Sequence, residues 1–184
     1  MAGLVDSIVN NDELVESIAN EIGIKASDAG SVITYLAPML MGAAKQNFQS
    51  SRDSADLLKQ IQDSQFSDMV DEPKKAVSQG NLMDLGNIIL NELTGSKENS
   101  GKVAIHVQKE TGVSDIIIKK ILPMIAPFII GALGKKAAPD INHHQQGGGS
   151  VAGGLEDILI SMIDKDHDGS IIDDMMQMAM KYFA

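Results

Sequence analysis

The sequence predicts an all-α fold in which one multi-helical unit occurs twice and a helix–loop–helix tail follows. Three observations predict this fold. Apolar residues recur at helical spacing along most of the chain, and no segment alternates apolar and polar residues over a useful length. One stretch of sequence also recurs 89 residues later. With 184 residues and no cysteine, the chain is long enough to bury a sizeable core without disulfides.

The N-terminal stretch, MAGLVDSIVNNDELVESIANEIG, predicts a helix that is retained in the mature protein. It carries acidic residues and has no lysine or arginine before Lys25, whereas a signal peptide begins with positive charge. We therefore expect a cytoplasmic protein, with leaderless export as the alternative.

The repeated segment covers residues 20–46, which align without gaps on residues 109–135. Each copy predicts a short helix that ends at a glycine, followed by a long apolar helix with an internal proline. We infer a duplicated unit, with copies at about 11–48 and 97–137 in a helical body of residues 1–138. The matched pairs are Gly23 with Gly112, Ala37-Pro38 with Ala126-Pro127, and Gly42-Ala43 with Gly131-Ala132.

Proline inside a helix removes one hydrogen-bond donor, so Pro38 should free the carbonyl of Thr34 and Pro127 that of Pro123. A kink is predicted in both long helices. The Gly-Ala pair one turn later should let another backbone approach closely.

The second long helix, residues 116–134, has the length of a membrane span. It also contains two lysines and two prolines, and its counterpart in the first copy is more polar. We therefore expect it to be buried in protein, with no membrane insertion.

The segments around the copies complete the body. Residues 51–62 predict an amphipathic helix, Pro73 predicts a break, and residues 81–95 predict a helix that ends at Gly95. After Pro139 the composition changes to Gly, Gln and His, which indicates a flexible linker over residues 139–153. Residues 154–184 form the predicted tail.

The tail contains the stretch DKDHDGSIIDDMM, which begins like the calcium loop of an EF-hand. Asp164, Asp166 and Asp168 occupy loop positions 1, 3 and 5, Gly169 occupies the sharp turn, and Ser170 would supply its backbone carbonyl. Calcium and magnesium both take such oxygen ligands. The sequence predicts a Ca²⁺ site here, with Mg²⁺ as the alternative occupant.

The closing ligand departs from the usual pattern, because position 12 is Met175, which cannot ligate a hard cation. Asp173 or Asp174 must take that role, and we favour Asp174 because position 11 lies nearer the usual place. A short aspartate and the lack of a partner loop predict weak binding, on the order of 10⁻⁵ to 10⁻³ M. The alternative is a solvated acidic turn whose aspartates cap the next helix.

Composition limits the function classes. The net charge of −10 and the 3% aromatic content argue against nucleic-acid binding. No catalytic motif or small-molecule site is apparent, so we expect no enzyme. Methionines of the tail could form a partner-binding face or dock on the body. The sequence therefore predicts a non-enzymatic calcium-binding protein that binds a protein partner or its own copies. The alternative is a structural subunit whose acidic loop is a staple or stays empty.

Several of these features together resemble a bacterial family known as domain of unknown function 937, with a looser likeness to YidB-like helical proteins. The features are the two Gly-to-Gly-Ala segments (23–43 and 112–132), the middle GNIILNELTGSK and the terminal DKDHDGSIIDD. The resemblance implies the order repeat, middle helix, repeat, Gly-rich linker and acidic loop. It implies no activity.

Overall fold

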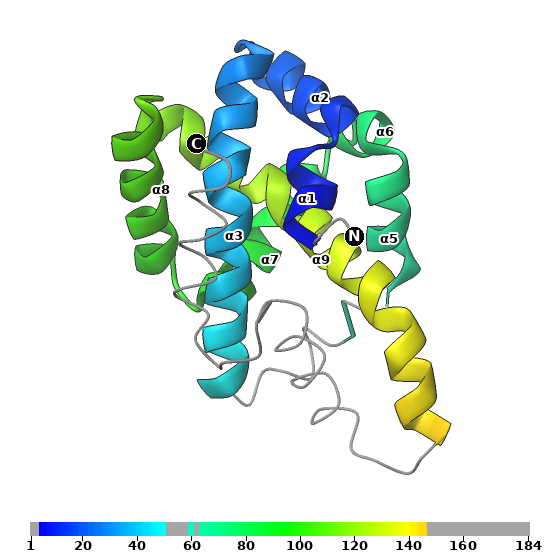
Figure 1. Cartoon of the computed structure of the whole chain (residues 1–184). Helices are drawn as coiled ribbons and strands as arrows, with labels where there is room; N and C mark the ends of the chain where they lie inside the picture. The colour runs from blue at the N-terminus through cyan, green and yellow to red at the C-terminus, as the bar shows by residue number, and fades with distance from the viewer. Residues whose placement is uncertain (1–3, 51–58, 61–62, 147–184) are drawn as a thin grey trace.

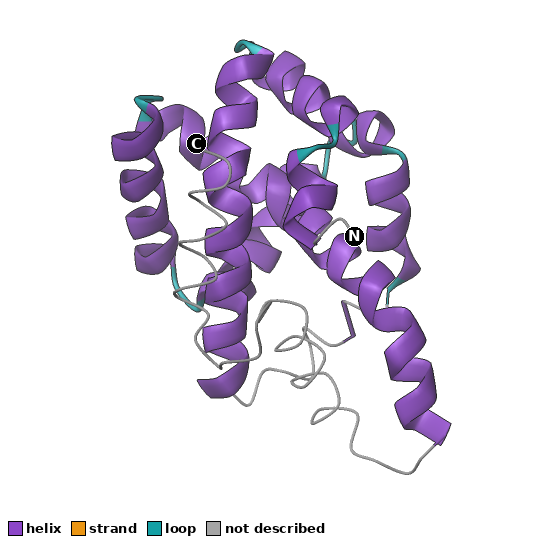
Figure 2. Cartoon of the chain, in the orientation of Figure 1, coloured by secondary structure: helices purple, strands orange, loops and turns teal. Residues whose placement is uncertain are grey.

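The computed structural model describes residues 4–50, 59–60 and 63–146, and the regular elements in these ranges are all helices (Figure 2). The all-α prediction is confirmed for this part of the chain. In chain order the helices are α1 (Leu4–Val9), α2 (Asp12–Ile22), α3 (Ala26–Ser50), α5 (Ser64–Asp71), α6 (Pro73–Val77), α7 (Leu82–Thr94), α8 (Lys97–Thr111) and α9 (Asp115–Gln146).

Helix α9 is the centre of the fold. It contacts α1, α2, α3, α5, α7 and α8, and Figure 1 shows it passing behind α3 and emerging beside α5. Every residue from 121 to 134 is buried. The segment Asp115–Lys135 is long and apolar enough to cross a membrane, with a mean hydropathy of 2.0, but 78% of its most apolar window is buried inside the fold. The position of this helix in the core is sufficient to explain its sequence.

The two segments predicted to be copies share backbone features at the same offset. Helix α3 begins at Ala26 and α9 begins at Asp115, which is 89 residues later. Gly23 ends α2 with a φ of 79°, and Gly112 ends α8 with a φ of 72°. In both turns the glycine N–H donates to the carbonyl four residues back, over 2.9 Å. Only a residue without a Cβ adopts this left-handed conformation freely.

Both long helices continue through their prolines. Helix α3 contains Pro38, and α9 contains Pro123 and Pro127, yet each is one continuous helix. The prolines therefore do not end the helices, and the kink predicted at each one stays a prediction.

Two element boundaries differ from those predicted. Helix α9 continues to Gln146, so residues 139–146 of the predicted linker are helical. The fixed φ of Pro139 is compatible with a helix, and the next helix-breaking residue is Gly147. The N-terminal stretch forms two helices instead of one, because the Asn11 side chain accepts a hydrogen bond from the Leu14 N–H over 3.1 Å and caps α2.

The middle of the body matches its sequence signals. Pro73 is the first residue of α6, so the break predicted there is confirmed. Gly95 ends α7 with a φ of 74°, as predicted. Most of the helix predicted over residues 51–62 lies outside the described residues.

Two glycines let helices touch α9 backbone to backbone. A Cβ placed on Gly86 of α7 would lie 2.5 Å from the carbonyl carbon of Pro123 and would overlap its oxygen. A Cβ placed on Gly131 of α9 would lie 2.6 Å from the carbonyl carbon of Phe66 in α5. The close approach predicted at the second Gly-Ala pair is therefore confirmed.

Substituting either glycine by alanine should destabilise the protein, because the new methyl group overlaps backbone that cannot move without shifting a helix. We expect Gly86→Ala and Gly131→Ala each to cost about 1–3 kcal/mol or more of unfolding free energy, measured by urea denaturation followed by circular dichroism. Gly101→Ala in α8 is the matched control, because a Cβ there meets nothing within 4 Å. It should be neutral or stabilising by up to about 1 kcal/mol. Equal midpoints for all three variants would contradict the packing argument.

Candidate functional site

The predicted metal site and the predicted tail lie outside the described residues. This holds for Asp164, Asp166, Asp168, Ser170, Asp173 and Asp174, so the structure gives no geometry for the loop. Within residues 4–50, 59–60 and 63–146, no group of three or more His, Cys, Asp or Glu side chains could hold a metal ion.

The described part of the chain has a surface pocket of about 300 Å³ between α5 and the segment that contains α6. The Asp63 side chain caps α5 by accepting a hydrogen bond from the Gln65 N–H over 3.0 Å. The chain then turns at Glu72 because Pro73 starts a new helix, and this turn brings the two short helices into contact. The lining residues are Gln65, Asp68, Met69, Glu72, Lys75, Ala76 and Gln79.

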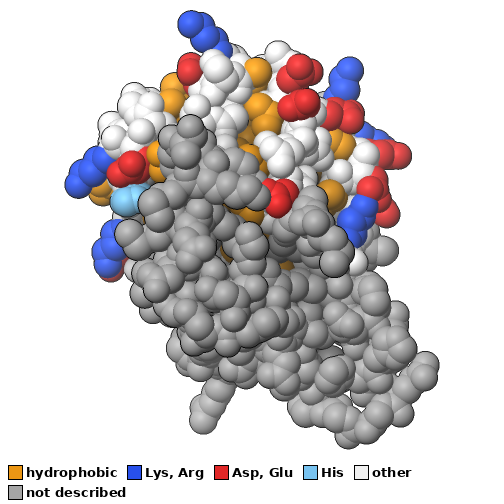
Figure 3. All heavy atoms as spheres, viewed as in Figure 1, with side chains coloured by type: hydrophobic (Ala, Val, Ile, Leu, Met, Phe, Trp, Pro, Cys, Tyr) orange, Lys and Arg blue, Asp and Glu red, His pale blue; other side chains and the backbone are white. Residues whose placement is uncertain are grey.

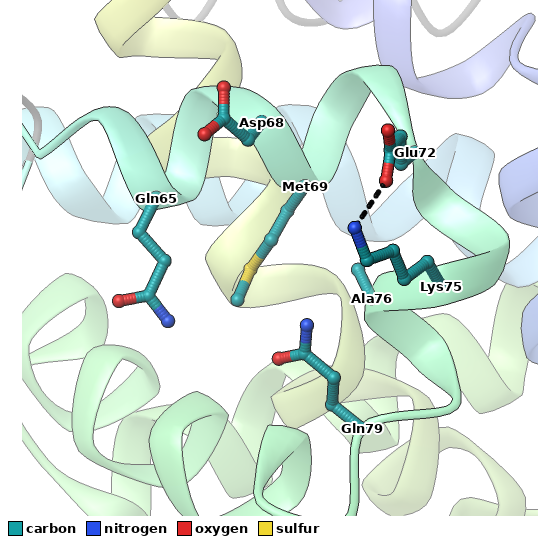
Figure 4. Close-up of a pocket in the computed structure, with 7 residues that line it drawn as sticks. All are labelled: Gln65, Asp68, Met69, Glu72, Lys75, Ala76 and Gln79. Carbon is teal, nitrogen blue, oxygen red and sulfur yellow. Dashed lines mark hydrogen bonds and ion pairs between the residues drawn. The ribbon is translucent and has the colours of Figure 1, made fainter.

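Figure 4 shows how these side chains lie. Those of Gln65, Met69 and Gln79 point toward the same space, with the ion pair of Glu72 and Lys75 at one side. Met69 is buried and forms an apolar surface, and the two amides supply hydrogen-bond donors and acceptors. The pocket is therefore lined by both polar and apolar groups.

The charged residues of the pocket include one ion pair. The Lys75 ammonium donates to the Glu72 carboxylate over 2.9 Å, and both side chains are exposed. This hydrogen bond and the charge of Glu72 raise the pKa of Lys75, with a smaller contribution from Asp68. The pair therefore favours the charged form of the lysine.

Sequence reasoning did not predict this pocket. The Pro73 break was visible, but the residues that line the pocket are ordinary polar and charged side chains spread over 15 positions, 65–79. They meet only because α5 and α6 fold against each other. His106 is exposed on α8 and does not line the pocket.

The described residues thus form a helical body built around one buried apolar helix, α9. The sequence matches the family model described as "Bacterial protein of unknown function (DUF937)" over residues 7–136. The chain belongs to this family. No curated protein and no solved structure matches it.

The matched residues include both predicted copies almost completely, together with the middle helix α7. They end ten residues before the end of α9, and the acidic loop lies beyond them. The family match therefore supports the helical body. The expected place of the acidic loop in the family, and the likeness to YidB-like proteins, stay predictions.

The Glu72–Lys75 pair gives a test of the pocket geometry. Replacing Glu72 by glutamine should lower the pKa of Lys75 toward its ordinary value, because the substitution removes both the charged acceptor and its field. NMR titration of the ¹³C-methylated lysine side chains measures this shift directly. In the native protein, any stability from this pair should be present below the ordinary lysine pKa and lost as the pH rises through the raised one. A Lys75 pKa that is the same with Glu72→Gln would show that the pair does not form in solution.

Proposed function

We propose that this protein is a non-enzymatic, calcium-binding helical protein that acts as a partner-binding or scaffold module. The observation that carries the proposal is the spacing of Asp164, Asp166 and Asp168 before Gly169. In this pattern three carboxylates at alternate positions surround a tight turn, and a following backbone carbonyl faces the same point. Hard divalent cations with oxygen ligands fit such a set, and Ca²⁺ is preferred over Mg²⁺ because its coordination is more flexible.

Electrostatics supports a bound cation. Residues 151–184 contain seven acidic residues against Lys165 and Lys181, a net charge of −5. Carboxylates crowded around one turn repel one another unless a positive charge lies between them. Asp174, or Asp173, would complete the ligands in place of the usual glutamate. We infer that residues 154–184 form a helix–loop–helix of EF-hand type.

The helical body supports the scaffold role. We infer that the body arose by duplication of one unit, since the turns at Gly23 and Gly112 and the starts of α3 and α9 coincide at the 89-residue offset. Core positions agree as well: Val32, Leu36 and Leu40 are buried, and so are Ile121, Ile125 and Ile129. The partner would be another protein or a second copy, and the burial of α9 supports a protein without membrane insertion.

A second candidate function is a structural or assembly subunit. In such a subunit a metal ion in the loop would only stiffen the tail, or the loop would stay empty. Met175 at loop position 12 favours this candidate, because it removes the bidentate ligand on which tight calcium sites depend. The two candidates differ in their response to metal. A calcium-responsive module changes its helicity or oligomeric state between calcium and chelator, whereas a stapled subunit keeps both the same.

The loop assignment predicts calcium binding that depends on the aspartates. Isothermal titration of the full chain should give a dissociation constant between about 10⁻⁵ and 10⁻³ M, and the double substitution Asp164→Ala, Asp166→Ala should abolish the signal. The matched control is Glu156→Ala, Asp157→Ala, which removes the same charge outside the loop and should bind nearly as well as the native chain. Among single variants, Asp174→Asn should weaken binding more than Asp173→Asn. Absence of heat with the native chain, or equal loss in both double variants, would refute a specific site.

The unusual residue at position 12 allows a gain-of-function test. Met175→Glu supplies the bidentate carboxylate that the loop lacks, so calcium should bind at least about tenfold more tightly, which is about 1.4 kcal/mol. Met176→Glu adds the same charge one residue later and should change the affinity far less. If the two variants bind alike, the gain is a general charge effect and the loop register is wrong.

A further inference from the structure

Helix α8 has an exposed face that combines positive charge with apolar surface. Lys102, Ile105, His106 and Lys109 follow the i, i+3, i+4, i+7 spacing that places side chains on one side of a helix. All four are exposed, and Ile105 keeps 51% of its surface accessible. We call these four residues the α8 face. In Figure 3 the area over α8 shows blue and pale-blue atoms beside orange ones.

The positive charges of the α8 face are not neutralised within the body. No ion pair is found for Lys102 or Lys109 among the described residues. Glu110, the acid next to Lys109, is near Tyr35 of α3, where its charge adds to the effect of burial in raising the pKa of that tyrosine. Near the start of α9, Ile116 is 66% exposed and Lys120 is exposed as well.

The segment that contains the α8 face is basic, although the chain as a whole is acidic. Residues 97–136 contain seven lysines against three acids, whereas the protein as a whole has a net charge of −10. The chain before this segment is acidic, and so is the chain after it. Opposite charges on two parts of one chain attract, and the attraction is strongest where apolar contact excludes water.

We propose that the tail of the same chain, residues 154–184, docks on the α8 face. The tail matches the face in both respects, because it has a net charge of −5 over residues 151–184 and is rich in methionine and other apolar residues. Its apolar residues include Ile158, Ile160, Met162, Met176, Met178 and Met180.

The other acidic candidate, α2 of a second copy, fits less well. The exposed residues of α2 are polar or acidic, and no large apolar side chain on this helix is exposed. It could pair with the lysines but would leave Ile105 uncovered. A partner that covers Ile105 needs apolar residues of its own, which the tail supplies.

The connection permits this docking when the tail itself spans part of the distance. Residues 147–153 link the end of α9 to the tail and reach about 25 Å if fully stretched, and the tail adds its own length to this reach. A body of this size is about 40 Å across. A tether of this length raises the effective concentration of the tail at the body to roughly millimolar, so even a weak contact is populated. Docking would cover the methionines of the tail. A protein partner that binds these methionines would then have to displace the tail from the α8 face.

Zero-length carbodiimide cross-linking of the native full chain tests this docking, because it joins only carboxylates and amines in ion-pair contact. The reaction is carried out in chelator at low salt, so its outcome does not depend on metal binding. We expect mass spectrometry of the monomer band to show Lys102 or Lys109 joined to tail acids such as Glu156, Asp157, Asp173 or Asp174, and their yield to fall in high salt. Lys74 and Lys75 on α6 should give no such products.

Two variants test whether apolar contact at Ile105 contributes to the docking, or whether the cross-links come from chance encounters of opposite charges. Ile105→Asp should lower the yield of these tail cross-links at least about fivefold, whereas Ile88→Asp on α7, which starts 56% exposed, should leave it unchanged. Circular dichroism confirms that both variants remain folded. Tail cross-links found only in a dimer band would assign the α8 face to a second copy and overturn docking within one chain. Cross-links spread evenly over all exposed lysines, or equal yields in the two variants, would overturn it as well.

Discussion

The fold depends on how closely α7 and α5 approach the backbone of α9. Pro127 has no N–H, so the carbonyl of Pro123 lacks its usual helical donor, and this is the carbonyl that Gly86 of α7 faces. A Cα–H of glycine can supply a weak hydrogen bond to such an oxygen, and the missing side chain allows the helices to meet there. Gly131, about two turns further along α9, lets the backbone of α5 approach at Phe66. The other core helices pack around the axis that these two contacts set.

The two long helices differ in how much of their surface is buried. In α3, Gly30 has only ordinary contact with Val15, at 3.5 Å, and the Thr34 hydroxyl donates to the Gly30 carbonyl over 2.8 Å. This helix has one side with polar residues. In α9 every residue from 121 to 134 is buried. The difference follows from the sequence, because α3 has polar residues on one side whereas this part of α9 is apolar all around.

Local signals in the sequence were sufficient to predict the helical class, the glycine ends at Gly23, Gly95 and Gly112, and the break at Pro73. Each glycine end and the proline break depend on the backbone conformations open to a single residue, and these can be predicted from the sequence without knowledge of the fold. The division at Asn11 and the extension of α9 to Gln146 were missed, because each depends on whether one polar residue caps or continues a helix. The α5–α6 pocket was missed because tertiary packing assembles it. The acidic loop was predicted from spacing alone, and its ligand geometry lies beyond the described residues.

The length of α9 has a mechanical consequence. It has 32 residues, or about 48 Å of helix, and about a third of it follows the buried segment that ends at residue 134. Figure 1 shows this outer part projecting from the body beyond α5. A stiff rod clamped at one end converts a small rotation at the clamp into a larger sweep at its tip. The packing of the interior therefore sets the direction in which the chain continues after Gln146. A repacking around Gly131 would change that direction.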